Sequence, residues 1–245
     1  MTQPPPNERV FLSAEWRDLV MLNYEVSPAL LAPRIPHGTE LDFHAGKTFI
    51  SLVGFRFLRT RLFGRLALPF HSNFDEVNLR FYVRREEGST LRRGVVFICE
   101  IVPRRAIAQV ARVVYGENYT SHPMRHLIGR NGTGFQAEYQ WEFKGRWCRL
   151  RAEASGSALH PAPGSLEQFI TEHYWGYNSR RGGQSIEYHV SHEPWRVWTA
   201  ASASFVGDGD ALYGRGFGEI LRRLPDSAFI ADGSPVTVSI GRTIT

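Results

Sequence analysis

Glu100 is the residue whose neighbours most clearly indicate chemistry. It interrupts an apolar segment, residues 95–102, that is predicted to form a strand. Burial raises the pKa of a carboxyl group unless a cation lies close, and such groups gather at functional sites. Arg104 and Arg105, shortly after the segment, could supply that cation. Glu100 is therefore either a functional acid or half of a structural ion pair that closes a barrel end. The other side chains expected on its face of the strand are aliphatic: Val96, Ile98 and Val102.

A second candidate is a row of polar side chains that alternates with apolar ones in residues 76–83. Its members are Glu76, Asn78, Arg80 and Tyr82. Side chains two residues apart share one face of a strand. If that face points into a barrel, the row offers an acid, an amide, a guanidinium and a phenol to one ligand. If it points outward, the row is a solvated face, which sequence alone makes the more common case.

A third candidate is the segment that contains Tyr115, Tyr119 and His122, which follows a predicted helix and is rich in Tyr, His and Asn. Loop residues of these types are suited to binding. His122 and His126 have the spacing of a helical metal-binding pair, but Pro123 lies between them and no third ligand is evident. We therefore predict no metal site here.

Other kinds of chemistry lack a motif. The chain has no Gly-x-Ser-x-Gly segment, Walker motif or dinucleotide fingerprint, so no cofactor is predicted. Cys99 and Cys148 stand apart and are predicted to be buried thiols. Of the 29 basic residues two, Lys47 and Lys144, are lysines and the other 27 are arginines, so an amine nucleophile has two candidates. The net charge is +5, but the arginines are scattered and no nucleic-acid module is present, so nucleic-acid binding is not expected.

These residues need a scaffold, and strand patterns dominate the 245-residue chain. Helices are predicted at residues 105–115, 165–174 and 217–224, with a short one near 27–31. Ser165 opens the second of these with a capping box. Asp232-Gly233 is typical of a hairpin turn between two strands. The other predicted strands are residues 49–58, 76–83, 95–102, 135–143, 146–153, 185–191 and 195–205.

Many short strands with a few short helices indicate a mainly β protein, an antiparallel sandwich or barrel. Residues 1–8 contain three prolines and are predicted to form an extended arm, followed by a single domain over residues 9–245. No secretory signal and no apolar run of membrane-spanning length is present, so we expect a cytoplasmic protein without membrane association. A homo-oligomer is possible.

Several segments in register resemble the YqjF-like family of uncharacterised proteins. The resemblance extends from about Phe11 to Ser239. The segments are Phe11-Leu-Ser-Ala-Glu-Trp16, Asn23-Tyr24, Ser51-Leu-Val-Gly-Phe55, Phe74-Asp-Glu-Val-Asn-Leu-Arg80, Arg93-Gly-Val-Val-Phe97, Glu100-Ile-Val-Pro-Arg-Arg105 and Tyr115-Gly-Glu-Asn-Tyr119.

That family is similar to the acetoacetate decarboxylase-like superfamily, which implies an antiparallel β-barrel with an internal cavity. In acetoacetate decarboxylase a lysine in a Pro-Lys-Lys segment forms a Schiff base with the substrate, and a glutamate and an arginine line the cavity. Here Arg104 takes the lysine position and Arg105 its neighbour, whereas Glu76 resembles the cavity glutamate. A guanidinium cannot form that imine, so decarboxylation by this route is not expected.

Three functions stay open. In the first, the cavity binds a small carboxylate- or oxo-bearing ligand, with Arg104 and Arg80 holding the anion through charge-assisted contacts. In the second, the protein is a lyase- or hydratase-type enzyme in which Glu76 and Glu100 act as an acid/base pair. In the third, the barrel is a non-catalytic interaction scaffold. The further residues expected at the ligand are Asn78, Tyr115, Tyr119 and His122.

Overall fold

Strands make up most of the part of the chain that the structure describes, as the sequence predicted. The computed structural model describes residues 9–63, 66–67, 72–109, 116, 118–180 and 182–244. The helical elements are α1 (Pro28–Leu31), η1 (Ala32–Arg34), α3 (Leu166–Thr171), α4 (Gly209–Tyr213) and α5 (Phe217–Arg222). The strands are β1 (Val10–Val26), β2 (Glu40–Leu41), β3 (Thr48–Leu62), β4 (Leu66–Ala67), β5 (Phe74–Glu87), β6 (Thr90–Val102), β7 (Tyr119–Ser121), β8 (Met124–Asn131), β9 (Gly134–Phe143), β10 (Arg146–Ser155), β11 (Trp175–Ser179), β12 (Ser185–His192), β13 (Val197–Val206), β14 (Ser227–Ala231), β15 (Pro235–Ser239) and β16 (Arg242–Ile244).

Each predicted strand coincides with an observed one, although β1, β2, β4, β7, β8, β11 and β16 were not predicted. The predicted cap of α3 is confirmed, since the Ser165 hydroxyl accepts a hydrogen bond from the Gln168 amide at 3.2 Å. The helix predicted at residues 105–115 is helical over 105–109, and its remainder lies outside the described residues, as does the predicted arm at residues 1–8.

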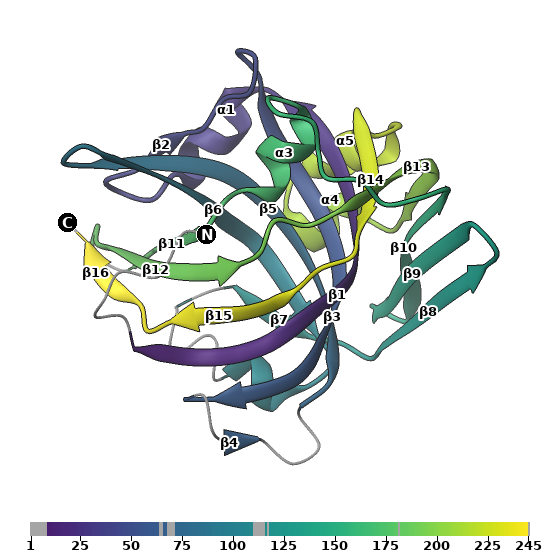
Figure 1. Ribbon diagram of the computed structural model, residues 1–245. Helices are drawn as coiled ribbons and strands as arrows, with labels where there is room; N and C mark the ends of the chain where they lie inside the picture. The colour runs from purple at the N-terminus through teal and green to yellow at the C-terminus, as the bar shows by residue number, and fades with distance from the viewer. Residues whose placement is uncertain are drawn as a thin grey trace.

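A closed ring of strands is the centre of the fold (Figure 1). Around the ring the order is β1, β3, β5, β6, β11, β12 and β15, which returns to β1. The pairs in this ring are antiparallel except for β6 with β11, where Trp175 lies opposite Gly94 and Gly176 opposite Val95. This short parallel contact closes the ring.

Strand β1 changes partner along its length within one continuous sheet. Val10–Glu15 pair with β15, whereas Leu19–Asn23 pair with β14. Asp18, between these stretches, has a left-handed φ of 57° that interrupts the regular strand. The hairpin predicted at Asp232-Gly233 is therefore wrong. The two flanking strands, β14 and β15, pair with successive parts of β1, and the turn carries the chain from one part to the next.

The outer face of the ring is covered by a second group of strands that continues from β14 through β13, β10 and β9 to β8 (Figure 1). Leu22 and Leu79 from the ring pack with Tyr139 and Leu150 from β9 and β10, and all four are fully buried. Phe217 of α5 joins the same cluster. The apolar face of β5 is thus used in this core, which leaves its polar face for the inside of the ring.

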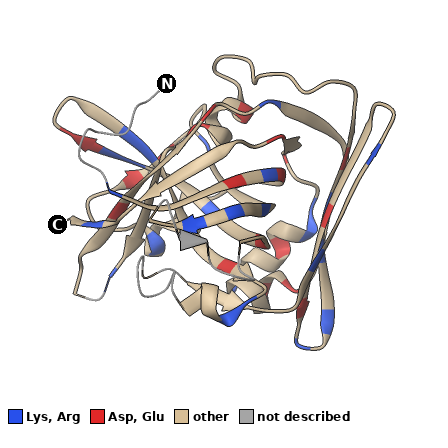
Figure 2. Ribbon diagram, turned by 60° about the horizontal axis from the view of Figure 1, so that its bottom comes forward, with Lys and Arg blue, Asp and Glu red and all other residues tan. Residues whose placement is uncertain are grey.

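Charged residues of both signs are spread over the strands and their ends (Figure 2). Many of the arginines are held in ion pairs with acidic groups. The largest such network surrounds Glu187, whose carboxylate is fully buried and contacts Arg85, Arg92 and Arg242 at 2.6 to 3.3 Å. No helix in the described part of the chain is long and apolar enough to cross a membrane.

Closure of the ring requires glycine at position 94. A Cβ placed there would lie 2.7 Å from the Trp175 carbonyl oxygen and 2.5 Å from the Tyr177 ring. We expect Gly94→Ala to lower the free energy of unfolding by about 1 to 3 kcal/mol, because the backbone of β11 cannot move without opening the barrel. Urea denaturation measures this change.

The matched control is Gly129→Ala on β8, where nothing lies within 4 Å of the added Cβ. It should change the free energy of unfolding by less than about 0.5 kcal/mol. Equal effects of the two substitutions would contradict the assignment of the β6–β11 contact as the tight point of the ring.

Candidate functional site

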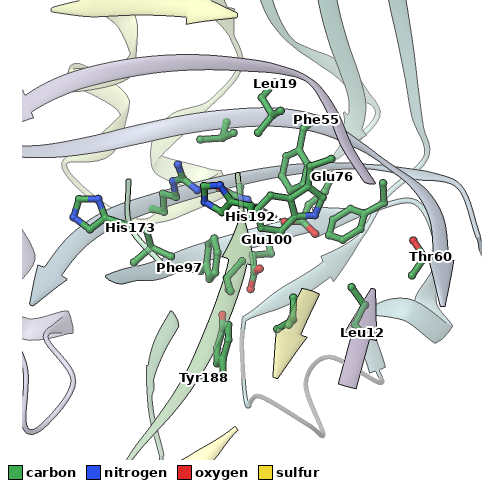
Figure 3. A pocket seen from close by; sticks show the side chains of 18 of the residues that line it. Leu12, Leu19, Phe55, Thr60, Glu76, Phe97, Glu100, His173, Tyr188 and His192 are labelled. Carbon is green, nitrogen blue, oxygen red and sulfur yellow. Dashed lines mark hydrogen bonds between the residues drawn. The ribbon is translucent and has the colours of Figure 1, made fainter. Parts of the chain in front are cut away.

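The ring encloses a cavity of about 330 Å³ (Figure 3). Its wall is mostly apolar and comes from the ring strands together with α3 and the residues that follow β6. Aromatic side chains such as Trp16, Phe55 and Phe97 form much of it. Polar side chains interrupt this wall at a few positions, and these positions decide what the cavity can bind.

Strand β5 supplies the first polar group. Glu76, Asn78 and Arg80 are 2%, 1% and 8% exposed, and all three line the cavity. The polar row predicted from the sequence therefore points into the barrel and is not a solvated face. Tyr82 continues the row but does not line the cavity, and its hydroxyl lies 2.5 Å from that of Ser51.

Strand β6 supplies Glu100 through a β-bulge. The register with β5 shifts after the Leu79–Cys99 pair, so that Arg80 lies opposite Phe97. Val96 and Ile98 consequently pack in the core outside the ring, whereas Phe97 and Glu100 line the cavity. The prediction that Glu100 shares a face with Val96 and Ile98 is wrong, because the extra residue reverses the alternation.

Glu76 is held by two neighbours. The Asn78 amide donates to one carboxylate oxygen at 2.9 Å, and the Tyr119 hydroxyl donates to the other at 3.3 Å. Burial raises the pKa of the Glu76 carboxyl to about 7, although these hydrogen bonds and the charge of Arg80 lower it. A carboxyl group with this pKa exchanges its proton near neutral pH, which suits a general acid or base.

Arg80 is a buried cation that forms no ion pair with an acidic side chain in the part of the chain that is described. It forms no hydrogen bond and no ion pair there, and its Nε is buried and unsatisfied. Its guanidinium carbon lies 5.8 Å from the centre of the Tyr82 ring. A buried charge in this state is costly unless an anion binds to it.

Two histidines complete the polar wall. Burial lowers the pKa of both His173 and His192 to about 4, so both rings are neutral at physiological pH. His192 is stacked on Trp195, with ring centres 4.3 Å apart. His173 contacts an Asp42 carboxylate oxygen through Nε2 at 3.1 Å. Figure 3 shows His192 near Glu76 and Glu100, with His173 farther along the cavity.

The remaining predicted residues divide into two groups. Tyr119 lines the cavity and contacts Glu76, whereas Arg104 and His122 are half-buried and are not among the described lining residues. Tyr115 lies outside the described residues. His126 contacts Asp75 at 2.9 Å, and no cluster of three or more potential metal ligands occurs among the described side chains.

Neither lysine lies at the cavity. Lys47 is on the surface, where its Nζ contacts a Glu25 carboxylate oxygen at 2.7 Å. Lys144 occupies a turn between β9 and β10 with a left-handed φ of 50°. Cys99 and Cys148 are buried and form no disulfide, as predicted.

Sequence reasoning missed His173, His192 and Asp42 as parts of the site. These residues are far apart in the sequence, at positions 42, 173 and 192, and no local motif connects them. The only signal was the aromatic neighbourhood of the two histidines, Tyr174-Trp175 and Trp195. Such a pattern is as common in a core as in a binding site.

Comparison with known proteins gives a family and a fold. The sequence profile of DUF2071, "Uncharacterized conserved protein (COG2071)", matches residues 13–235. The "Uncharacterized protein YqjF" of Bacillus subtilis (strain 168) is 24% identical over 192 residues, which cover 76% of this chain and 74% of that protein.

Solved structures similar to this chain include acetoacetate decarboxylase from Legionella pneumophila, with a TM-score of 0.65 and 12% identity over 100% of this chain and 92% of that one. The enduracididine biosynthesis enzyme MppR complexed with pyruvate has a TM-score of 0.67 and 15% identity, and the match covers 100% of this chain and 92% of that one. An acetoacetate decarboxylase-like enzyme from Sphingomonas wittichii RW1 has a TM-score of 0.62 and 12% identity, with 100% and 98% covered. These similarities establish an acetoacetate decarboxylase-like fold.

The raised pKa of Glu76 makes the stability of the protein depend on pH. Because the pKa is about 7 in the folded chain and 4.5 ordinarily, the folded state binds more protons between these values. Wild type should therefore lose stability as pH rises from 4.5 to 7, by up to about 3 kcal/mol from this group. Glu76→Gln should lack this loss, so its free energy of unfolding relative to wild type should increase between pH 5 and pH 8.

The control is Glu86→Gln, which neutralises an exposed glutamate on the same strand. Its free energy of unfolding should differ from that of wild type by the same amount at both pH values. A Glu76→Gln variant that behaves like this control would show that Glu76 is ionised with an ordinary pKa.

Proposed function

Because this chain belongs to the DUF2071 family and has an acetoacetate decarboxylase-like fold, we propose that its barrel cavity binds a small oxo acid. Arg80 holds the carboxylate of the ligand, and Asn78 contributes a second polar contact beside it. The oxo-bearing part of the ligand lies against Glu76, Tyr119 and Glu100. The apolar wall surrounds the carbon chain and excludes water.

The observation that carries this proposal is the state of Arg80. Guanidinium groups bind carboxylates through paired, charge-assisted hydrogen bonds. The Nε of Arg80 is buried without a partner, and the group makes no ion pair with any described residue. A ligand carboxylate supplies the charge that this buried cation lacks. The charges of Glu76 and Arg80 interact, but no ion pair joins the two side chains, and burial favours the neutral form of Glu76.

The size of the cavity supports a small ligand. A volume of about 330 Å³ lies near the lower end of the roughly 300 to 1,000 Å³ typical of small-molecule pockets. Among proteins of this fold, MppR has been seen complexed with pyruvate, and pyruvate is an oxo acid. A filled lumen would favour an interaction scaffold, whereas this barrel contains a cavity.

Chemistry at this site does not pass through a lysine imine. The chain has two lysines, and both lie outside the cavity. Arg104, at the position that resembles the imine-forming lysine of acetoacetate decarboxylase, is a guanidinium and cannot take that role. The decarboxylase mechanism therefore lacks its nucleophile here.

Glu76 favours a second candidate, an acid/base enzyme of the lyase or hydratase type that acts on the same oxo acid. The carbon next to an oxo group loses a proton to a nearby base and forms an enolate. Glu76, with a pKa of about 7, can accept that proton, and Arg80 can stabilise the negative charge. Glu100 is a second carboxyl group in the same cavity.

We expect pyruvate to bind wild type and to bind Arg80→Met at least about tenfold more weakly, because a hydrogen-bonded charge pair contributes about 1.5 to 3 kcal/mol. Isothermal titration calorimetry at pH 6.5 measures both affinities. Methionine keeps the length and apolar character of the arginine stem, so the fold should be retained.

The matched control is Arg84→Met, which removes the same charge from the same strand. Arg84 pairs with Glu40 at 2.7 Å on the surface and does not line the cavity. Its affinity for pyruvate should equal that of wild type. Equal affinities of the Arg80 and Arg84 variants for pyruvate would contradict the assignment of Arg80 as the anion site. A wild-type protein that binds no oxo acid would contradict it as well.

The acid/base candidate predicts that wild type exchanges the methyl protons of pyruvate for deuterium in D₂O, and that Glu76→Gln loses most of this exchange. Loss of a general base typically lowers a rate by about 10² to 10⁴. Proton NMR of the pyruvate methyl signal follows the exchange, and Glu86→Gln is the control. Equal exchange rates in wild type and Glu76→Gln would rule out Glu76 as the base.

An imine would also accelerate this exchange, so the same incubation is repeated with borohydride and examined by mass spectrometry. We expect no stoichiometric pyruvate adduct on the protein, because neither lysine reaches the cavity. A stoichiometric adduct would contradict the exclusion of the imine.

A further inference from the structure

His173 is a polar group of the cavity that the proposed function does not use. It lies between α3 and β11, its side chain is 1% exposed, and it lines the cavity. Its ring packs against Tyr82 and Phe169, with centres 4.7 and 5.0 Å away. Its Nδ1 is buried and has no hydrogen-bond partner. A buried polar atom without a partner, in the wall of a cavity, is a position where a ligand group can bind.

Asp42 decides which kind of group that is. An Asp42 carboxylate oxygen lies 3.1 Å from His173 Nε2 and 2.7 Å from Arg93 Nε. Although burial opposes it, hydrogen bonds from His173 and Arg93 lower the pKa of Asp42, so Asp42 is ionised and only accepts. Nε2 must therefore carry the proton and donate it. In a neutral imidazole the other nitrogen, Nδ1, is then an acceptor.

The ring stays neutral because it is buried and because two arginines lie near it. Burial is the main cause that lowers the pKa of His173, and it outweighs Asp42, which raises that pKa; the charges of Arg93 and Arg80 lower it further. A nearby cation makes a second positive charge unfavourable. Protonation at Nδ1 would be needed to turn it into a donor, and this environment opposes that protonation throughout the physiological range.

The acceptor and the anion site are two groups in the wall of one cavity. Arg80 and His173 both contact the Tyr82 ring, at 5.8 Å for the guanidinium carbon and 4.7 Å for the imidazole centre. Figure 3 shows His173 apart from Glu76 and Glu100. A ligand whose carboxylate meets Arg80 can thus extend a different part of itself to His173.

We propose that the ligand of this cavity is an oxo acid with a hydrogen-bond donor, such as a hydroxyl or N–H group, at the end away from its carboxylate, and that His173 Nδ1 accepts this bond. The proposal rests on the proposed function, since Arg80 holds the carboxylate end. His173 is the residue that determines specificity, and Asp42 is a positioning residue that keeps Nδ1 unprotonated.

Two ligands of the same chain length test this assignment. 4-Hydroxy-2-oxobutanoate ends in a hydroxyl group where 2-oxopentanoate ends in a methyl group. An otherwise apolar wall favours the methyl compound. We expect wild type to bind the hydroxyl compound at least about tenfold more tightly, because the methyl compound leaves Nδ1 buried and unsatisfied. Isothermal titration calorimetry gives both affinities.

Substitutions at His173 test whether this residue causes the preference for the hydroxyl compound. His173→Phe keeps an aromatic ring of similar size between Tyr82 and Phe169 and should lose the preference while its affinity for 2-oxopentanoate stays the same. His173→Asn offers an amide oxygen near the position of Nδ1 and should restore part of it. His189→Phe is the control, because His189 is a buried histidine that does not line the cavity, and it should keep the wild-type ratio.

Asp42→Ala tests the positioning role. It removes the acceptor that holds the proton on Nε2, so the neutral ring can carry its proton on Nδ1, which then donates. We expect this variant to bind an oxo acid that ends in a methoxy group, which only accepts, more tightly relative to the hydroxyl compound than wild type does. An unchanged ratio would remove Asp42 from the assignment.

The outcomes separate this inference from the proposed function. If wild type binds both ligands equally, and His173→Phe does not change the ratio of the two affinities, the role of His173 is overturned and the anion site is unaffected. Wild type that binds neither ligand overturns both. A hydroxyl preference that His173→Phe removes, together with loss of both ligands in Arg80→Met, supports both.

Discussion

The site depends on the short parallel contact between β6 and β11. Around the rest of the ring, longer antiparallel pairings hold the strands, but here Trp175 and Gly176 alone lie opposite Gly94 and Val95. Glycine at positions 94 and 176 permits this approach, since a Cβ at either would collide with an aromatic ring. Closure at this contact turns the polar face of β5 from a surface into the wall of a cavity and removes water from it.

Water exclusion explains the electrostatics of the cavity. In a closed apolar space the charged form of an ionisable group is disfavoured. Glu76 responds with a raised pKa, and His173 and His192 respond with lowered ones. Arg80 cannot respond in this way, because a guanidinium does not lose its proton in proteins. The cavity therefore combines a fixed positive charge with an acid that can change its charge near neutral pH.

The arginines of this chain serve different purposes according to where the fold places them. Arg85, Arg92 and Arg242 neutralise the buried Glu187, and Arg93 holds Asp42 in place behind His173. Arg80 is the one among these five that has no acidic partner. This difference makes it the group in the barrel interior that an anion would neutralise.

The sequence by itself determined nine of the strands, β3, β5, β6, β9, β10 and β12 to β15, and the polar row. Polar and apolar residues alternate along β5, and this alternation identified the strand. The pattern arises because one side of β5, with Leu79 and Phe81, packs in the core, whereas the other side carries the polar row. The sequence also established that the chain has two lysines, and the resemblance of its motifs pointed to the fold. These properties are local or compositional, so they can be read without coordinates.

Only the tertiary structure decided which way the polar row faces and which residues join it. The bulge in β6 reverses the side of Glu100, and a bulge depends on pairing between strands rather than on the strand alone. The partner change of β1 at Asp18 replaced the predicted hairpin for the same reason. His173 and Asp42 are 131 residues apart, and only the closed ring brings them together. Long-range pairing of this kind leaves no periodic signal in a sequence, because it is fixed by packing between distant segments.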